Sequence, residues 1–334
     1  MNILLTSVGR RSYLVEYFKQ AIGSQSKVVA ANSEALTSGM ISADKSYTVP
    51  SVDSDEYIPR LLEICQDNNI GLVVSLFDID LPYLAKARAQ FLKRGIEVAV
   101  SDPEVIDIAN DKWQTYLFLT EKNIATPRTY LILNDALEDL GGSKIEFPVI
   151  VKPRWGMGSL SVFKADNGQE LEFFYHYAIR QIEKSYLNIL SRDDLAKSVL
   201  VQEFIPGKEY GLDVFNNLKG DHIQTIAKQK LAMRSGETDM SKVIENKQLN
   251  QIGENLSKVL RHRGNLDVDV LENTAGELFV LEMNARFGGG YPFSHLAGAN
   301  FPRALVDMAM DRYIQPSKIQ YGTVGLKSIQ LLKS

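Results

Sequence analysis

The sequence predicts a chain of mixed architecture, α/β in its first third and α+β in the remainder. Residues 1–105 alternate short apolar segments with amphipathic ones, a pattern typical of a parallel sheet with helices on both faces. From Phe147 onward the apolar segments are longer and more often arranged as hairpins. One of these hairpins, residues 266–286, carries acidic side chains in apolar surroundings. These observations set the fold class and single out the hairpin.

In the first third, short apolar runs alternate with segments in which the apolar residues repeat at helical spacing. Apolar runs predict buried strands at 2–7, 27–31, 71–76 and 97–100, and helical periodicity predicts helices at 12–22, 55–66 and 81–94. The first turn, SVGRRSYL, lacks the Gly-x-Gly-x-x-Gly of a dinucleotide fold, so NAD or FAD binding has little support. Its Arg10-Arg11 pair is an unassigned cationic site suited to a substrate carboxylate.

The remainder begins with one helical stretch, residues 102–122, and a turn at Pro127. Strands are expected at PVIVKP and its partner LSVFKA, and then at SVLVQEF, KEYGLDVF and HIQTIAKQKLAM. The segment 302–313 is expected to form a surface helix.

Composition limits the classes of function. At 334 residues the chain has room for two or three subdomains, and 45% hydrophobic with 23% charged residues is ordinary for a globular protein. A net charge of −4 without a long basic run disfavours nucleic acid as a partner. The single cysteine, Cys65, excludes an intramolecular disulfide, and we expect it to be buried. With no signal peptide and no long apolar stretch, we expect a cytoplasmic protein without a membrane partner.

The hairpin places Asp269 and Glu282 on neighbouring strands joined by the turn Asn-Thr-Ala-Gly. Both acids lie within apolar runs, where two adjacent carboxylates repel unless a cation lies between them. Asn284 lies on the same face of its strand as Glu282. Two carboxylates and an amide oxygen form a hard ligand set that suits Mg²⁺, so we predict a metal site. The alternative is a surface hairpin with solvated acids.

A lysine and a glycine loop follow each other after an apolar strand. Lys152 ends PVIVKP, and Gly156, Gly158 and Ser159 come next. Glycines allow backbone N–H groups to approach a phosphate, and the serine adds a hydroxyl donor. The alternative is an ordinary hairpin turn. Lys112, in ANDKWQ, is a second candidate cation.

Another strand end, Gln202-Glu203-Phe204-Ile205, leads through Pro-Gly to Glu209. Such an end exposes backbone groups that suit a purine edge, and Glu209 is placed to accept bonds from ribose hydroxyls. The alternative is an exposed turn with solvated charges.

Two arginines are candidates for catalysis. Arg286 leads into three glycines and suits a tightly held oxyanion, and Arg234 lies in the polar segment LAMRSGETD. The alternative for each is an ordinary surface arginine, and a functional role is favoured more for Arg286 than for Arg234.

In this order the pieces resemble the ATP-grasp superfamily. The resemblance rests on Lys112, then VKP with its glycine loop, then QEFIPGKE, and finally D-V…LEMNAR. It implies ATP and two Mg²⁺ ions, with Mn²⁺ as a possible substitute. By the same likeness Lys112 and Lys152 bind phosphates, the glycine loop covers them, residues 202–205 border adenine and Glu209 meets ribose. Asp269, Glu282 and Asn284 become the metal ligands.

The resemblance covers nearly the whole chain and implies a domain division. A Rossmann-like preATP-grasp domain is expected at 1–105, followed by a two-lobed ATP-grasp fold with an N-terminal lobe at 106–197 and a C-terminal lobe at 198–334. EMNARFGGGYPFSHLAGANFPRALVDMA is similar in layout to one ATP-grasp half of the carbamoyl-phosphate synthase large subunit. Small carboxylate–amine ligases of the pyrrolysine-biosynthesis type share that layout. The sequence shows one such half and no candidate glutaminase triad.

The leading functional hypothesis is an ATP- and Mg²⁺-dependent ligase that activates a small carboxylate as an acyl phosphate for attack by an amine. Its substrates would be amino-acid-like, and a homodimer or a partner subunit is possible. One alternative is a carbamoyl-phosphate-synthase-like subunit that phosphorylates bicarbonate or carbamate. Another is a nucleotide-binding module without turnover. Arg286 would steady the transferred phosphoryl group or the tetrahedral intermediate, with Arg234 in support.

Overall fold

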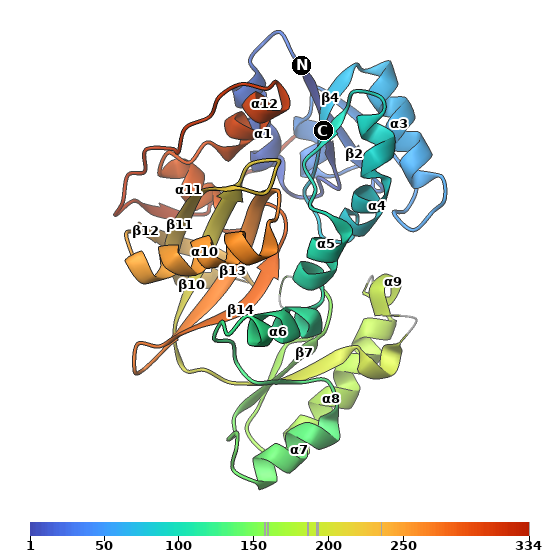
Figure 1. Ribbon diagram of the computed structural model, residues 1–334. Helices are drawn as coiled ribbons and strands as arrows, with labels where there is room; N and C mark the ends of the chain where they lie inside the picture. The colour runs from blue at the N-terminus through green and yellow to red at the C-terminus, as the bar shows by residue number, and fades with distance from the viewer. Residues whose placement is uncertain (157, 159, 186, 192–193, 235, 334) are drawn as a thin grey trace.

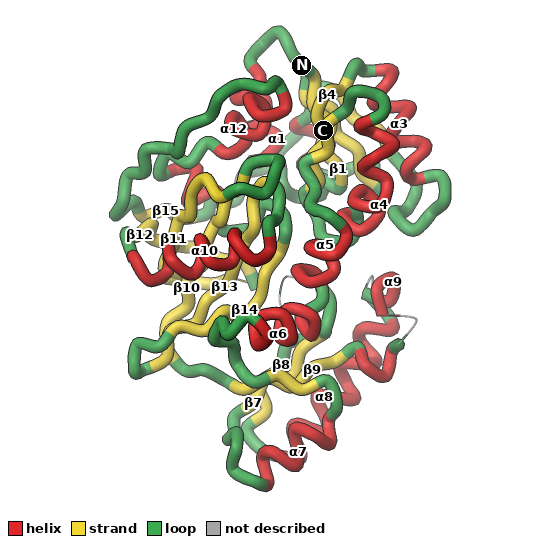
Figure 2. The backbone as a smooth tube through the Cα atoms, viewed as in Figure 1, coloured by secondary structure: helices red, strands yellow, loops and turns green. Residues whose placement is uncertain are grey.

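The computed structural model describes residues 1–333 apart from 157, 159, 186, 192–193 and 235. The described residues form three sheets, of five, four and six strands, which follow one another along the chain (Figure 1; Figure 2). No helix among the described residues is both long and apolar enough to cross a membrane.

The first sheet is parallel and has the strand order β3-β2-β1-β4-β5. Its strands are β1 (Asn2–Thr6), β2 (Val28–Asn32), β3 (Lys45–Thr48), β4 (Ile70–Ser75) and β5 (Glu97–Val98). Helix α1 (Ser12–Ile22) packs with the face that carries Ile3 and Leu5, whereas α3 (Tyr57–Asp67) and α4 (Leu81–Leu92) pack with the face that carries Leu4. The predicted parallel sheet with helices on both faces is therefore confirmed. The sequence did not reveal β3, because most of its residues are exposed and form no apolar run.

The helical stretch predicted over residues 102–122 is wrong as a single helix. It is divided into α5 (Pro103–Asn110) and α6 (Lys112–Glu121), which meet at Asp111. The Asp111 backbone is extended, and its side chain accepts hydrogen bonds from the first backbone N–H groups of α6. Arg154 also binds the Asp111 carboxylate, with an Nη2–Oδ2 distance of 2.6 Å. An aspartate that caps a helix explains a break that hydrophobic periodicity does not show.

The second sheet is antiparallel and small, with the order β6-β9-β7-β8. Its strands are β6 (Thr129–Tyr130), β7 (Val149–Pro153), β8 (Phe163–Ala165) and β9 (Val199–Glu203). The pairing of β7 with β8 confirms the predicted hairpin. Helices α7 (Leu133–Gly141) and α8 (Gly168–Glu183) cover this sheet and share a separate apolar core with it, and neither helix was predicted. In Figure 1 this lobe extends away from the rest of the molecule. The short helix α9 (Asn188–Ser191) and a 3₁₀ turn at Leu195–Lys197 precede β9.

The third sheet has the order β14-β13-β10-β11-β12-β15. Its strands, which are antiparallel, are β10 (Gly207–Asn216), β11 (His222–Arg234), β12 (Glu237–Ile244), β13 (Gly264–Asn273), β14 (Leu278–Asn284) and β15 (Val324–Leu326). Helix α10 (Lys247–Leu260) covers one face (Figure 1). Helices α11 (Tyr291–Leu296) and α12 (Phe301–Ala309) follow the sheet, and a short helix α2 (Ser38–Ser42) belongs to the first domain.

The expectation of a surface helix over 302–313 needs correction. Helix α12 ends at Ala309, and it buries Leu305 and Val306 in the apolar cluster that also contains residues of α1. The helix therefore fastens the end of the chain to the first domain.

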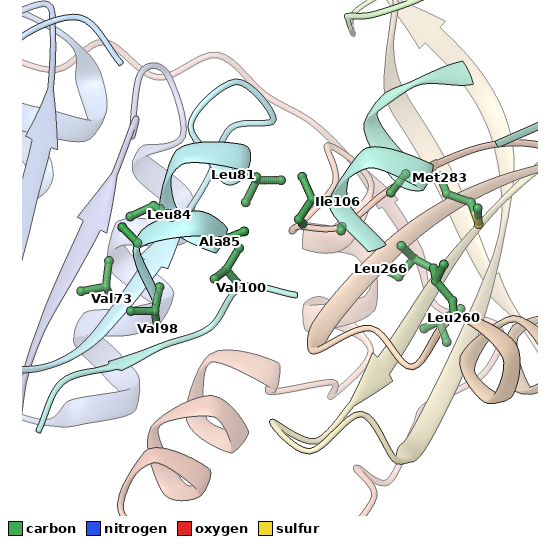
Figure 3. Close-up of a cluster of buried hydrophobic side chains, with 14 of the residues drawn as sticks. Val73, Leu81, Leu84, Ala85, Val98, Val100, Ile106, Leu260, Leu266 and Met283 are labelled. Carbon is green, nitrogen blue, oxygen red and sulfur yellow. The ribbon is translucent and has the colours of Figure 1, made fainter. Parts of the chain in front are cut away.

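The first and third sheets share an apolar core. Figure 3 shows side chains of this cluster, from Val73 and Leu84 beside the first sheet, through Ile106 of α5, to Leu266 and Met283 of the third sheet. The second sheet has its own core. Two of the three sheets are thus joined by one core, and the region where the three meet holds the candidate site.

Candidate functional site

One face of the third sheet carries charged side chains in strands that are otherwise apolar. Glu209, Gly211 and Asp213 alternate on β10, and Asp267 and Asp269 alternate on β13. Gly211 lies opposite Asp269 on one side and opposite Lys228 of β11 on the other. Because residues two apart share a face of a strand, this register gathers the charges into one polar face.

The hairpin places its acids next to each other, as its sequence predicts. Asp269 of β13 is the register partner of Glu282 on β14, and Asp267 is the partner of Asn284. Asn273 opens the turn between these strands. The two predicted acidic ligands are therefore neighbours, and Asn284 lies one position further along the same face.

A lysine that the sequence analysis did not identify compensates one of these acids. Lys230 of β11 reaches across Gly211, with its Nζ 2.8 Å from Asp269 Oδ1 and 2.6 Å from Glu209 Oε1. The lysine side chain is only 9% exposed. Burial opposes its charge, but Asp269 and Glu209 outweigh burial and raise the pKa of Lys230 above its ordinary value. Glu209 is therefore held in the same cluster as the metal-ligand candidates.

Around Asp269, Lys230 does not balance all of the neighbouring acids. Burial raises the pKa of Asp269 to about 7, Lys230 offsets part of that effect, and the neighbouring carboxylates of Asp267 and Glu282 add to it. Such an excess of buried negative charge is relieved by a divalent cation, and carboxylate and amide oxygens are the ligands that Mg²⁺ prefers. Among the described residues no three His, Cys, Asp or Glu side chains form a metal cluster by themselves. The predicted set fits Mg²⁺ with an amide and further oxygens from water or phosphate.

Lys112 connects the glycine loop with the acids. It is the first residue of α6, and its Nζ donates a hydrogen bond to the backbone carbonyl of Gly156 at 2.6 Å and lies 3.7 Å from Glu282 Oε2. Burial alone would raise the pKa of Glu282, but the charges of Lys112 and other nearby cations hold it below its ordinary value. The structure thus brings three of the predicted site residues together.

Lys152 lies on β7 and is only 4% exposed. Its Nζ donates to Gln202 Oε1 of β9 at 2.8 Å, and Gln202 Nε2 in turn donates to Thr129 Oγ1 at 2.8 Å. Burial lowers the pKa of Lys152 to about 8, and the charge of Glu282 opposes this shift. A buried lysine with a neutral partner lacks direct compensation, which favours an anionic ligand beside it.

The strand end at 203–205 is held in a different way. The Glu203 backbone N–H donates to the Arg128 carbonyl at 2.8 Å, and the Arg128 backbone N–H donates to the Glu203 carboxylate at 3.1 Å. The ring of Phe204 lies 5.3 Å from Lys164 Nζ, and Ile205 is partly buried. These contacts fix the end of β9, and the adenine role of the segment remains a prediction. Ser159 of the glycine loop lies outside the described residues. Gly158 lines a cavity, here called the main cavity, whose wall also includes Lys230, Asp269, Glu282 and Arg286.

Arg286 is buried in a network that spans two domains. Its Nη2 donates to Asp78 Oδ2 at 2.9 Å, and its Nη1 lies 3.5 Å from Asp267 Oδ2. Arg11, from the first domain, donates to the carbonyl of Phe287 at 2.6 Å, as Arg286 Nη1 does at 3.1 Å. Burial opposes the charge of Arg286, but Asp78 and Asp267 outweigh it and raise its pKa. The predicted catalytic arginine therefore lies at the contact between the first domain and the acids.

Arg234, the other predicted catalytic residue, lies apart from this network. Its guanidinium binds Asp239 at 2.8 Å, and its side chain is 61% exposed. Its neighbours Met233 and Gly236 line the main cavity. The catalytic role of Arg234 remains a prediction.

The three glycines after Phe287 each leave room for a charged side chain. A Cβ on Gly288 would lie 2.0 Å from the carboxylate carbon of Asp267, and one on Gly290 would lie 3.3 Å from Lys228 Cε. A Cβ on Gly289 would lie 3.8 Å from Lys327 Nζ and 3.9 Å from Glu237 Oε2. The glycine run is therefore the wall of a cavity lined with charges.

Sequence reasoning missed several charged residues of the site, chiefly Lys228, Lys230, Asp213, Asp267, Asp78 and Glu237. The signal available for some of them was the spacing of two in Lys228-x-Lys230 and Asp267-x-Asp269 within apolar strands. Asp78 gave no comparable signal, because it follows β4 in a loop and meets Arg286 only in the folded chain.

Comparison with known families identifies this architecture. A model of the ATP-grasp domain matches residues 109–290. The chain belongs to the ATP-grasp family. A model described as the PylC-like N-terminal domain matches residues 3–99. These matches confirm the predicted family and fold class and the expectation of an ATP-dependent ligase of this superfamily.

Curated relatives of this ATP-grasp chain include carbamoyl-phosphate synthases. One from Methanobrevibacter smithii is 24% identical over 332 residues, which cover 94% of this chain and 82% of the relative. The large chain of a Thermoanaerobacter enzyme is 22% identical over 303 residues, which cover 88% of this chain and 26% of that relative. The chain therefore spans about a quarter of the length of the large-chain relative.

Solved structures share the fold at low sequence identity. A biotin carboxylase domain of the Hydrogenobacter thermophilus 2-oxoglutarate carboxylase, in complex with MgADP and bicarbonate, has a TM-score of 0.75 and 14% identity, covering 97% of this chain and 73% of that one. An L-amino acid ligase from Bacillus licheniformis has a TM-score of 0.69 and 18% identity, covering 92% and 75%.

Proposed function

We propose that the protein is an ATP- and Mg²⁺-dependent ligase that converts a small carboxylate into an acyl phosphate, which an amine then attacks. The observation that carries the proposal is the arrangement of two lysines, Lys112 at the start of α6 and Lys152 on the second sheet, with Asp269 and Glu282 on the third sheet. Lys112 lies 3.7 Å from Glu282, so the cations and the acids share one space. Phosphate oxygens bind to the lysines and a metal ion binds to the acids, which is the division of charge that a nucleotide triphosphate requires.

Each residue of the site has a role in this reaction. Lys112 and Lys152 hold phosphate oxygens, and Gly156 and Gly158 allow the loop to approach them closely. Gln202, Glu203, Phe204 and Ile205 border adenine, and Glu209 accepts from ribose. When bound to Asp269, Glu282 and Asn284, Mg²⁺ supplies charge neutralisation, with two ions expected and Mn²⁺ as a substitute.

Arg286 steadies the transferred phosphoryl group from its position between Asp78 and Asp267. Because both acids fix its guanidinium, it offers its charge without having to reorganise. The glycine loop shields the acyl phosphate from water. The amine attacks the acyl carbon, phosphate leaves, and the amine loses its proton, so no side-chain nucleophile is needed.

A second candidate function is phosphorylation of bicarbonate or carbamate. The specific observation that favours it is the similarity of 94% of this chain to the Methanobrevibacter smithii carbamoyl-phosphate synthase, at 24% identity. Bicarbonate-dependent ADP release without any amino acid distinguishes this candidate from the first. A nucleotide-binding module without turnover is disfavoured because Asp269, Glu282 and Asn284 are all present, whereas a degenerate module is expected to lose its metal ligands first.

A screen for Mg²⁺-dependent ADP release over amino acids, other small acids and bicarbonate tests the proposal, with hydroxylamine to trap the acyl phosphate. Asp269→Asn and Glu282→Gln should each lower kcat by about a hundredfold or more, because they weaken binding of the Mg²⁺ that would neutralise the triphosphate. Glu277→Gln, in the exposed turn of the same hairpin, is the matched control. Unchanged ADP release in both site variants would contradict the assignment.

A further inference from the structure

The main cavity extends beyond the acids into a region of mixed charge. Arg11 of the first domain and Glu237 of β12 both line this region. Burial tends to raise the pKa of Glu237, but the charges of Lys327, Arg11 and Arg10 outweigh it and hold the pKa below its ordinary value. Glu237 pairs with Lys327 at 3.1 Å and shares the cavity with Arg11.

The position of Arg11 relates this region to the reaction centre. Arg11 and Arg286 donate to the same carbonyl, that of Phe287, so their guanidinium groups are neighbours. Arg286 approaches Asp267, which is the register partner of Asn284. A carboxylate bound to Arg11 therefore lies toward the metal-ligand candidates, on the side where it would accept a phosphoryl group.

The ammonium group that contacts Glu237 comes from the end of the chain. Lys327 follows β15, its backbone N–H donates to Asp239 O at 2.8 Å, and its Nζ lies 3.1 Å from Glu237 Oε2. The Glu237 side chain is 56% exposed, so Lys327 can turn toward solvent without leaving a buried charge behind. Gly289 borders this ion pair, and its missing side chain leaves space beside it.

From this arrangement we infer that Arg11 and Glu237 form the subsite for the acid substrate, and that this substrate is an α-amino acid. Arg11 holds the carboxylate, Glu237 holds the α-ammonium, and Lys327 Nζ lies where that ammonium binds. The inference rests on the proposed function and specifies its substrate. Arg11 and Glu237 line the same cavity, and an α-amino acid carries a carboxylate and an ammonium together, which suits a cavity with a cation and an acid in its wall.

Other substrate chemistries fit the subsite less well. A simple carboxylic acid would use Arg11 but leave Glu237 without a ligand. A dicarboxylic acid would place a second negative charge against Glu237, at a cost in binding free energy. Bicarbonate has no ammonium group to pair with Glu237. The side chain of the amino acid is not specified by these contacts.

The experiment compares each α-amino acid with its 2-hydroxy acid of the same side chain, in ADP release and in equilibrium binding with a non-hydrolysable ATP analogue. Glu237→Gln keeps the shape of the side chain and removes its charge. It should raise KM and Kd for the amino acid by about tenfold or more, while leaving values for the hydroxy acid within about twofold. Lys327→Met removes the competing ammonium and should lower KM for the amino acid by about two- to tenfold. These opposite shifts would not follow from a merely structural role.

Glu254→Gln is a matched control, because Glu254 is also paired with a lysine, Lys258, at 3.1 Å, but on the exposed surface of α10. Equal use of amino and hydroxy acids, or equal effects of Glu237→Gln on both, would overturn the subsite and leave the ligase function standing. Glu237-dependent binding of amino acids without ADP release from any acid would instead keep the subsite and overturn the ligase function. ADP release with bicarbonate alone would overturn both.

Discussion

Lys152 should make nucleotide binding depend on pH, because its buried ammonium loses its proton near pH 8. Its ammonium is buried, with Gln202 Oε1 at 2.8 Å, and burial lowers its pKa to about 8 in the protein without nucleotide. The proposed phosphate contact requires the protonated form. A phosphate loses its second proton near pH 6, so raising the pH from 7 to 9 changes the lysine rather than the nucleotide.

The magnitude follows from that pKa. A group with a pKa of about 8 is roughly 90% protonated at pH 7 and roughly 10% protonated at pH 9. The Kd for ADP without metal, which leaves the titration of Asp269 out of the measurement, should therefore rise by about tenfold over this range, which corresponds to about 1.4 kcal/mol of binding free energy. The sign is fixed, because binding takes up a proton above pH 8 and so weakens as protons become scarce.

Equilibrium titration with a fluorescent ADP analogue at several pH values measures this effect. Lys152→Arg keeps the charge throughout the range and should remove most of the pH dependence, whereas Lys152→Met should bind weakly at every pH. Circular dichroism of each variant shows whether the fold is retained. A wild-type Kd that changes less than twofold between pH 7 and pH 9, or a Lys152→Arg variant with the same pH profile as the wild type, would refute the reasoning.

Three further predictions concern the wall of the cavity, the stability and the distant arginine. Gly288→Ala would place a Cβ 2.0 Å from the carboxylate carbon of Asp267, so thermal or urea unfolding should show a loss of about 1–3 kcal/mol in the free energy of unfolding. Gly168→Ala is the control, because the space around its Cβ is open and stability should change little. Burial lowers the pKa of His262 from 6.5 to about 4. Because the unfolded state takes up the proton first, the folded protein should lose about 3 kcal/mol of stability as the pH falls from 7 to 4. The His262→Gln variant should show a flatter dependence of the unfolding free energy on pH in urea titrations. Arg234→Ala should leave the free energy of unfolding within about 0.5 kcal/mol of the wild type, since the ion pair of Arg234 with Asp239 is exposed. If Arg234 supports the reaction, the variant should have a lower kcat in steady-state kinetics. An unchanged kcat would remove Arg234 from the reaction.

The elements that the sequence predicted well are those whose apolar pattern is strong. Helix α1 has the predicted bounds, because its apolar residues repeat at helical spacing toward one face. The hairpin acids were also predictable, since Asp269 and Glu282 interrupt apolar strands that must pair through a short turn. Strand β3 is mostly exposed, and the break at Asp111 depends on a cap and an ion pair, so periodicity could reveal neither. The domain boundaries at 105 and 197 remain predictions.

The compensation of the acids could not be predicted in the same way. Lys230 meets Asp269 only because β10 lies between their strands and Gly211 has no side chain to separate them. Strand order and register are properties of the folded sheet, and a one-residue slip would turn Lys230 to the other face. The spacing of Lys228 and Lys230 in an apolar strand does show that the polar face exists, but it does not show which acid each lysine meets.

The network around Arg286 adds a constraint on how the site can work. Asp78 and Arg286 are 208 residues apart in sequence, and their contact holds the first domain against the strand that carries Asp267. These two domains also share one apolar core, whereas the lobe that carries Lys152 has a core of its own. The acids, Arg286 and Arg11 therefore form one fixed unit. Any adjustment that fits the site around a nucleotide must come from the second sheet, which would carry Lys152 and the glycine loop toward the acids together.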